Sequence, residues 1–225
     1  MGNQSRTEIR DSAGALTRVK VCGIRRIQDA VLATDLGASA VGLVFWPQSP
    51  RFIDPYRARA IAAALPPGVT PVGVFVDQPA EFVMGVARLI PLGAVQLHGS
   101  ESLASFARLA QRLIKAVPAT EHFDAADIDE LPPYVTVLLD AHDPVLRGGT
   151  GRTIDWSVAA AVAARRRTIL SGGLTPANVG EAVERVRPYM IDVSSGVESS
   201  PGVKDPVKLR RFFEALGAAS VKPKA

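Results

Sequence analysis

An acidic residue at the end of an apolar run is the first feature of this sequence that could do chemistry. Leu138 and Leu139 lead to Asp140, and a glycine-rich segment at 147–151 follows before the next expected helix. In α/β proteins, a strand that ends in an acid and opens onto glycines places a reactive group beside a bound ligand. Asp140 is therefore the first candidate functional residue.

Three other reactive side chains lie at or just past the ends of apolar runs, namely Cys22, His98 and Asp192. Side chains alternate across a β-strand, so Lys20 is expected to share a face with Cys22, and Gln96 with His98. A single inward cysteine would be typical of a small core residue. Several such groups at one edge indicate a polar site instead, because burying unpaired acids is costly.

Eight short apolar runs position these residues, with helical or connecting segments between them. The predicted strands are 18–22, 40–45, 72–76, 93–97, 113–117, 134–139, 168–171 and 190–193. This alternation implies a parallel sheet, and eight units imply an α/β fold closed into a single (β/α)8 TIM barrel. An open doubly wound sheet would more usually carry a G-x-G-x-x-G motif after its first strand, which residues 22–25 do not resemble.

Cap residues mark where the intervening helices are expected to begin. The predicted caps are Asp54, Asp77, Ser100, Asp155, Thr175 and Asp205. Residues 120–130 are acidic and only weakly periodic, so the fifth helix is expected to be short or missing. The barrel is assigned to residues 18–218, after a flexible N-terminal extension at 1–17 and before a C-terminal tail at 219–225.

Turns rich in small residues follow the last two predicted strands, and another, at 148–151, follows the sixth. Loops after strands seven and eight are where such barrels bind phosphate through backbone N–H groups. Any one of these segments could be a plain tight turn, but the two adjacent ones predict a phosphorylated small-molecule ligand. The predicted phosphate-binding residues are Gly172, Gly173, Ser194, Ser195 and Gly196.

Arg51 is a further charged candidate, on the loop after the second strand. An isolated arginine is ordinarily a solvated surface residue. Here Pro50 precedes it and apolar Phe52 follows it, which favours a positioned guanidinium. The parallel donors of a guanidinium suit a carboxylate.

Composition narrows the class of protein. Apolar residues make up 47% of the chain and charged residues 21%, and 26 basic against 22 acidic residues give a net charge of +4. No aromatics are interleaved with the basic residues, so nucleic acid is not expected as a partner. With no apolar run near the ~18 residues of a membrane span and no signal-peptide pattern, the protein is expected to be cytoplasmic, without a membrane partner.

Cysteine and histidine usage argues against a metal or a disulfide. The single cysteine cannot form an internal disulfide or, alone, a thiolate metal site. The three histidines, at 98, 122 and 142, lack ligand spacing. No metal is therefore expected. No long exposed apolar stripe demands a partner subunit, and a monomer is predicted.

Seven motifs in one order carry a resemblance to a known family. They are 19–24 (VKVCGI), 42–45 with 49–51 (GLVF and SPR), 72–76 (VGVFV), 95–99 (VQLHG), 138–140 with 148–151 (LLD and GGTG), 170–174 with Asn178 (LSGGL), and 191–198 (IDVSSGVE). Together they resemble the phosphoribosylanthranilate isomerase family of tryptophan biosynthesis. The resemblance runs from about residue 18 to residue 213.

The resemblance implies a cofactor-free Amadori rearrangement of an aminoaldose phosphate to an aminoketose phosphate. By the family's pattern, Asp140 is the general acid that opens the furanose ring, and Cys22 is the general base that takes the C2 proton. Arg51 would hold the anthranilate carboxylate, and the glycine turns would hold the phosphate. The predicted substrate-binding residues are Lys20, Arg51, His98 and Asp192.

These roles require shifted pKa values. With ordinary pKa values of about 8.5 and 3.9, only about 3% of Cys22 would be thiolate and about 0.1% of Asp140 protonated at pH 7. Lys20 is expected to lower the pKa of the thiol. Asp192 is a source of like charge for Asp140.

Two alternatives stay open from sequence. One is another sugar-phosphate isomerase or epimerase of the same layout, although such epimerases commonly use metal-binding sets of histidine and aspartate. The other is a catalytically inactive barrel that binds a phosphorylated ligand. That alternative predicts loss of Cys22 or Asp140, and both are present.

Overall fold

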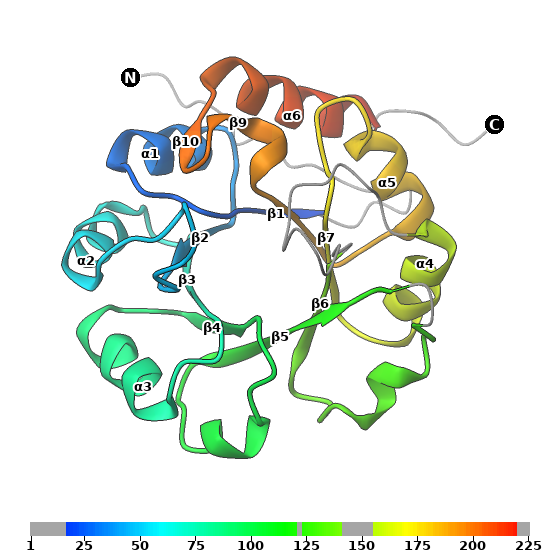
Figure 1. Ribbon diagram of the computed structural model, residues 1–225. Coiled ribbons are helices and arrows are strands. Elements are labelled where there is room, and N and C mark those ends of the chain that lie inside the picture. The colour runs from blue at the N-terminus through cyan, green and yellow to red at the C-terminus, as the bar shows by residue number, and fades with distance from the viewer. Residues whose placement is uncertain (1–16, 121–122, 141–154, 220–225) are drawn as a thin grey trace.

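Eight parallel strands close into a single barrel in the computed structural model (Figure 1). The structure describes residues 17–120, 123–140 and 155–219. Neighbouring strands are hydrogen-bonded in chain order, and β8 pairs with β1 to close the ring. The strands are β1 Arg18–Val21, β2 Ala40–Val44, β3 Thr70–Phe75, β4 Ala94–Leu97, β5 Arg112–Pro118, β6 Thr136–Asp140, β7 Thr168–Ser171 and β8 Met190–Val193. The predicted TIM barrel is confirmed.

Helices surround this barrel (Figure 1). The α-helices are α1 Ile27–Asp35, α2 Pro55–Ala64, α3 Ala80–Leu89, α4 Trp156–Arg165, α5 Val179–Val186 and α6 Pro206–Ala219. The 3-10 helices are η1 Leu103–Phe106, η2 Asp127–Glu130 and η3 Ser195–Val197. In the described part of the connection between β5 and β6, η2 is the only helix, which confirms the prediction of a short or missing fifth helix. The fourth helix is also reduced, to the single turn of η1, although the sequence predicts a full helix there.

Three predicted caps are confirmed by their hydrogen bonds. The Asp54 side chain accepts from the N–H groups of the first turn of α2, and Asp155 does the same for α4. Asp205 accepts from the N–H groups of Val207 and Lys208 at the start of α6. Each carboxylate satisfies helix N–H groups that have no partner within the helix.

The other three predicted caps are wrong. Asp77 has a left-handed backbone (φ 56°), and α3 begins three residues later, behind Pro79. Its carboxylate instead accepts from the backbone N–H and the hydroxyl of Ser100, which joins the loops after β3 and β4. The Thr175 hydroxyl accepts from the Ala177 N–H at 3.3 Å, but in a turn that precedes the helix, because α5 begins at Val179.

The barrel interior changes from apolar to polar along the strands. One interior layer is apolar and consists of Ala40, Val72, Ala94, Ile114, Ala116, Leu138, Ile169 and Met190. On the outer face, Val21, Val95 and Ile191 belong to the larger core beneath the helices. Lys20 and Gln96 are also buried, and they alternate with these outward residues as predicted. The polar layer thus lies toward the carboxyl ends of the strands.

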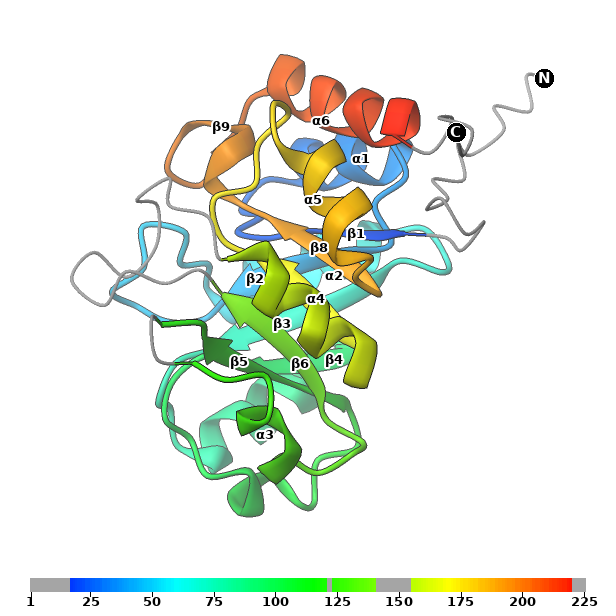
Figure 2. The same cartoon turned by 90° about the vertical axis from the view of Figure 1, so that its right-hand side faces the viewer.

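A short antiparallel hairpin follows β8 and was not predicted. It consists of β9 Glu198–Ser200 and β10 Val203–Lys204, and it leads directly into α6. The side view shows α6 lying along α1 and α5 (Figure 2), and residues of α6 contact both helices. The hairpin therefore lies between the end of β8 and the last helix, beside the barrel mouth.

Several predictions concern residues at the edges of the described ranges. The extension at 1–17 and the tail at 219–225 lie outside the described residues except for Thr17 and Ala219, so these boundaries stay predictions. The glycine-rich segment at 147–151 and two of the three histidines, at 122 and 142, also lie outside. Within the described ranges, no helix is long and apolar enough to span a membrane.

Candidate active site

A buried ion pair lies at the seam where the barrel closes. Lys20 on β1 is in register with Asp192 on β8, and Nζ lies 3.0 Å from the Asp192 carboxylate. The Lys20 side chain has 0% of its surface exposed. Burial alone would lower the pKa of Lys20, but Asp192 and Cys22 raise it above its usual value, so the ammonium stays charged. Lys20 is therefore a buried cation beside Cys22, and its role in substrate binding stays a prediction.

Cys22 comes directly after β1, and its N–H donates to the Val193 carbonyl at 2.8 Å. The sulfur lies so close to β2 that a Cβ on Gly42 would be 2.6 Å from Sγ. Burial raises the pKa of the thiol; Lys20 and Lys204 lower it, and Asp192 raises it. The net direction is upward, so Lys20 acts as expected but does not overcome burial.

A chain of three polar side chains crosses from β4 to β6. The Gln96 amide nitrogen lies 2.9 Å from Nδ1 of His98, and Nε2 of His98 lies 3.2 Å from the Asp140 carboxylate. If the Gln96 amide donates to Nδ1, the His98 proton is on Nε2 and faces Asp140. The structure thus brings the predicted acid together with His98, on the side of the barrel away from Cys22.

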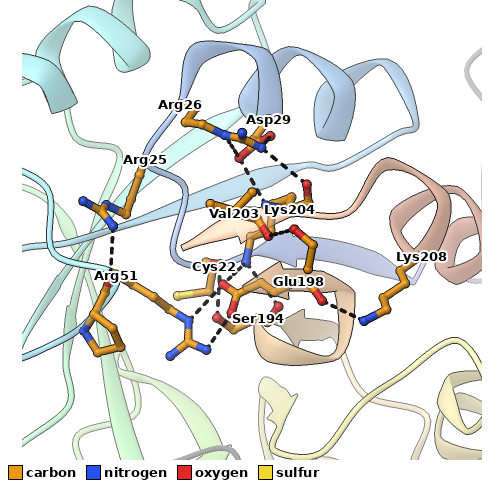
Figure 3. Close-up of polar contacts among 12 residues, drawn as sticks. Cys22, Arg25, Arg26, Asp29, Arg51, Ser194, Glu198, Val203, Lys204 and Lys208 are labelled. Carbon is orange, nitrogen blue, oxygen red and sulfur yellow. Dashed lines mark hydrogen bonds and ion pairs between the residues drawn. The ribbon is translucent and has the colours of Figure 1, made fainter. Parts of the chain in front are cut away.

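Arg51 is held by a carboxylate that sequence reasoning did not assign to the site. Its Nε and Nη2 donate to the two oxygens of Glu198, at 3.0 and 2.7 Å (Figure 3). A Cβ on Gly23 would lie 2.6 Å from Cδ of Arg51, and Gly23 has a φ of +76°. The arginine side chain therefore crosses directly over the turn that follows β1. The predicted positioning of this guanidinium is confirmed.

Lys204 is a second residue that sequence reasoning missed. Its Nζ donates to Glu198 at 2.9 Å and to the Ser194 carbonyl at 3.2 Å, and its side chain has no exposed surface. The Ser194 hydroxyl in turn donates to the Cys22 carbonyl at 3.3 Å. Glu198 lies in one of the motifs quoted above, but Lys204 carries no sequence signal that distinguishes it from a surface lysine.

The two predicted phosphate turns lie against each other. Gly172 and Gly173 both have positive φ, and the Asn178 amide donates to the Gly173 carbonyl at 2.9 Å. Gly196 in η3 packs so closely on the Leu174 carbonyl that a side chain there would collide with it. This geometry brings the turns after β7 and β8 together at one side of the barrel mouth. Phosphate binding by these residues stays a prediction.

Known proteins resemble this chain in sequence and in fold. A family model described as N-(5'-phosphoribosyl)anthranilate isomerase matches residues 19–215. The chain belongs to this family. Among curated members, the Geobacter sulfurreducens isomerase is 46% identical over 203 residues, which cover 88% of this chain and 97% of the relative. The Geobacter metallireducens isomerase is 46% identical and covers 90% of this chain and 100% of its own length.

Solved structures of the family show the same barrel. The isomerase from Thermotoga maritima superposes with a TM-score of 0.82 at 40% identity, covering 90% of this chain and all of that one. A second solved structure of the isomerase superposes with a TM-score of 0.78 at 39% identity, with the same coverage. It holds reduced 1-(o-carboxyphenylamino)-1-deoxyribulose 5-phosphate. The resemblance inferred from the seven sequence motifs is thereby confirmed.

Proposed function

We propose that this chain catalyses the isomerisation of N-(5'-phosphoribosyl)anthranilate to 1-(2-carboxyphenylamino)-1-deoxyribulose 5-phosphate in tryptophan biosynthesis. The reaction needs no cofactor. The match of the family model along residues 19–215 carries this proposal. The site geometry supports it, because Cys22 and the Asp140–His98 pair lie at separate points of one barrel mouth. A substrate between them can receive a proton from one side and lose a proton to the other.

Asp140 is proposed as the general acid. Protonation of the furanose ring oxygen by its carboxyl group breaks the bond from that oxygen to C1 and leaves a protonated Schiff base. His98, 3.2 Å away, supplies the contact that fixes the orientation of the carboxylate. General acid catalysis of this kind typically contributes about 10²–10⁴-fold to a rate.

Cys22 is proposed as the general base that removes the proton from C2. The enolamine that results relaxes to the ketone, so the reaction neither gains nor loses atoms. Because burial raises the pKa of the thiol, the thiolate is the minor form at neutral pH. Lys20 and Lys204 favour the thiolate through their positive charges. Because Cys22 must be ionised while Asp140 is protonated, a rise in pH increases the first fraction and decreases the second, so activity is expected to fall at both extremes of pH.

The surroundings of Cys22 suit an anionic substrate. Three cations (Lys20, Arg51 and Lys204) and two carboxylates (Asp192 and Glu198) give a local charge of +1, from 3 minus 2. We propose that Arg51 binds the anthranilate carboxylate and that the turns after β7 and β8 bind the phosphate. Backbone N–H groups in such turns are suited to phosphate.

The test is the loss of anthraniloyl fluorescence when purified protein meets phosphoribosylanthranilate generated in situ. Cys22→Ala and Asp140→Asn are expected to lose at least about 100-fold in kcat. Turnover that survives either substitution would contradict the role given to that residue. Wild-type protein that binds inorganic phosphate but turns nothing over would favour the inactive ligand-binding barrel instead.

Assembly and location are separate proposals. A monomer stays the prediction for this chain, whereas the isomerase from Thermotoga maritima is described as dimeric in a solved structure of its monomeric forms. Sedimentation of the full chain at micromolar concentration distinguishes the two states. A cytoplasmic location likewise stays a prediction from the sequence.

A further inference from the structure

Glu198 is the point where three parts of the chain meet beside the site. It comes from the hairpin after β8, it binds Arg51 from the loop after β2, and it binds Lys204 from β10 (Figure 3). Only 5% of its side chain is exposed. A buried carboxylate between two cations is retained at a cost in desolvation, so its geometry merits a functional explanation.

The way Glu198 binds Arg51 leaves the substrate-binding end of the guanidinium available. A guanidinium has five N–H donors in a fixed fork. Glu198 accepts from Nε and from one hydrogen of Nη2. Three hydrogens are not used by Glu198, namely the second of Nη2 and the two of Nη1. The remaining Nη2 hydrogen and one Nη1 hydrogen form the end-on pair that matches a second carboxylate.

The backbone of the hairpin is itself fixed to the helices around it. Asp29 of α1 accepts from the Lys204 N–H at 3.3 Å, and Arg26 binds both oxygens of Asp29. On the other side, Lys208 of α6 donates to the Glu198 carbonyl at 2.8 Å. The Glu198 carboxylate therefore projects from a braced segment and can hold a longer, less constrained side chain in place.

We propose that Glu198 is a positioning residue that fixes the orientation of Arg51 for recognition of the aromatic carboxylate of the substrate. The proposal rests on the proposed function, in which Arg51 binds that carboxylate. Through Lys204, which donates to the Ser194 carbonyl, the same carboxylate is also linked to Ser194, whose hydroxyl donates to the Cys22 carbonyl. Glu198 thereby links recognition of the substrate ring to the turn that is proposed to bind phosphate.

The test compares two ligands that differ only in the carboxylate. One is reduced 1-(o-carboxyphenylamino)-1-deoxyribulose 5-phosphate, an analogue of the product. The other is the same molecule with a phenyl ring that lacks the carboxylate. Binding of both is measured by calorimetry in wild type, Glu198→Gln and Glu198→Asp. In Glu198→Gln, the affinity for the carboxylated ligand is expected to fall about tenfold, and the affinity for the other ligand less than about twofold.

Glu198→Asp keeps the charge but shortens the reach, so it is expected to restore part of the lost discrimination. Glu181→Gln, which removes an exposed ion-paired carboxylate of α5, is the matched control and is expected to bind both ligands as wild type does. Equal weakening of both ligands in Glu198→Gln would reveal a merely structural role and overturn the proposal. Unchanged binding of both would overturn it too.

Loss of Glu198 leaves the ammonium of Lys204 buried and unpaired, which can prevent folding. Burial already lowers the pKa of Lys204 below its usual value, which shows that its charge is held at a cost. The double variant Glu198→Gln/Lys204→Met removes both charges and is expected to fold, and it must show the same selective loss of the carboxylated ligand. If wild type binds neither ligand and shows no turnover, the proposed function fails and this proposal fails with it.

Discussion

At the scale of single residues, opposing effects act on the pKa of Cys22, the proposed general base. Burial disfavours its thiolate, whereas two buried ammonium groups favour it, and burial is the larger effect. The sequence could predict Lys20 as one of these cations because side chains alternate along a strand. It could not predict Lys204, which reaches the site from a hairpin of two-residue and three-residue strands.

Replacement of Lys20 by methionine tests this balance. The positive charge of Lys20 lowers the pKa of Cys22, whereas the negative charge of Asp192 raises it. Without Lys20, the effect of Asp192 is no longer offset by its ion-pair partner. We expect the pH at which iodoacetamide alkylates Cys22 at half its maximal rate to rise by about one unit or more. Cys22 is the sole cysteine, so the alkylation rate reports it alone.

The double variant Lys20→Met/Asp192→Asn is the control for this experiment. It removes a charge that lowers the thiol pKa together with one that raises it, so its profile is expected to lie closer to that of wild type. An alkylation profile that is identical in Lys20→Met and wild type would contradict the role given to Lys20.

Gly23 offers a second prediction at this scale. Its φ of +76° and its contact with Arg51 leave no room for a side chain. Gly23→Ala is expected to destabilise the protein by about 1–2 kcal/mol and to raise the KM for the substrate, because Arg51 must move.

Gly85→Ala is the matched control. Gly85 lies within α3, where a Cβ meets nothing within 4 Å, so stability is expected to rise by about 0.5–1 kcal/mol. Urea unfolding and steady-state kinetics measure both effects. An unchanged KM in Gly23→Ala would contradict the contact's functional importance.

At the scale of elements, the sequence predicts strands better than helix starts. All eight strands were predicted because apolar runs flanked by polar residues are local signals. The predicted cap at Asp77 was wrong because its carboxylate binds Ser100, a contact between two loops that local patterns do not contain. The arginines at and just after the end of α4 bind other elements: Arg165 pairs with Asp129, and Arg167 lies over the Tyr189 ring.

Arg166 explains how the barrel accommodates its missing fifth helix. Its guanidinium donates to four backbone carbonyls of the connection between β5 and β6, those of Ile128, Leu131, Pro132 and Val135. A helix would have satisfied such carbonyls internally. The arginine therefore replaces the hydrogen bonds of a helix at this connection.

Arg166→Met is accordingly expected to lower the free energy of unfolding by about 2–3 kcal/mol, because it removes four hydrogen bonds. The carbonyls of Ile128 and Pro132 keep the backbone N–H groups of Leu131 and Val135 as donors. Arg165→Met is the control on the same helix end, where the pair with Asp129 is exposed and screened by solvent, so the loss is expected to be smaller. Urea unfolding of both variants checks the difference. Equal losses in the two variants would mean that the guanidinium of Arg166 is not what holds the connection.

At the scale of the whole molecule, the barrel is closed by charged residues as well as by backbone hydrogen bonds. Lys20 and Asp192 join β1 to β8, while Glu198 joins the hairpin after β8 to the loop after β2. The periodicity of the sequence places Lys20 and Asp192 on the inner faces of their strands, but the ion pair between them was not predicted. The pair of Glu198 with Arg51 was not predicted either, because neither residue lies on a strand of the barrel.

The ion pairs of Glu198 make the free energy of unfolding depend on pH, and the direction of this dependence follows from the pKa of Glu198. Burial by itself would raise the pKa of Glu198, but the bonds from Arg51 and Lys204 lower it below its usual value. A carboxyl group whose pKa is lower in the folded state binds protons more readily when unfolded. Its contribution is therefore present above the unfolded pKa of about 4.3 and is lost as the pH falls through the lower folded pKa.

We therefore expect the free energy of unfolding of wild type to fall between pH 5 and pH 3, and to fall less steeply in Glu198→Gln/Lys204→Met. The double variant has no carboxylate at this position and no buried ammonium that needs one, so protonation there cannot separate the hairpin from the loop after β2. Urea titrations at pH 5, 4 and 3 give the two slopes. Parallel slopes would mean that other carboxylates account for the acid sensitivity, and that Glu198 fixes Arg51 without stabilising the barrel as a whole.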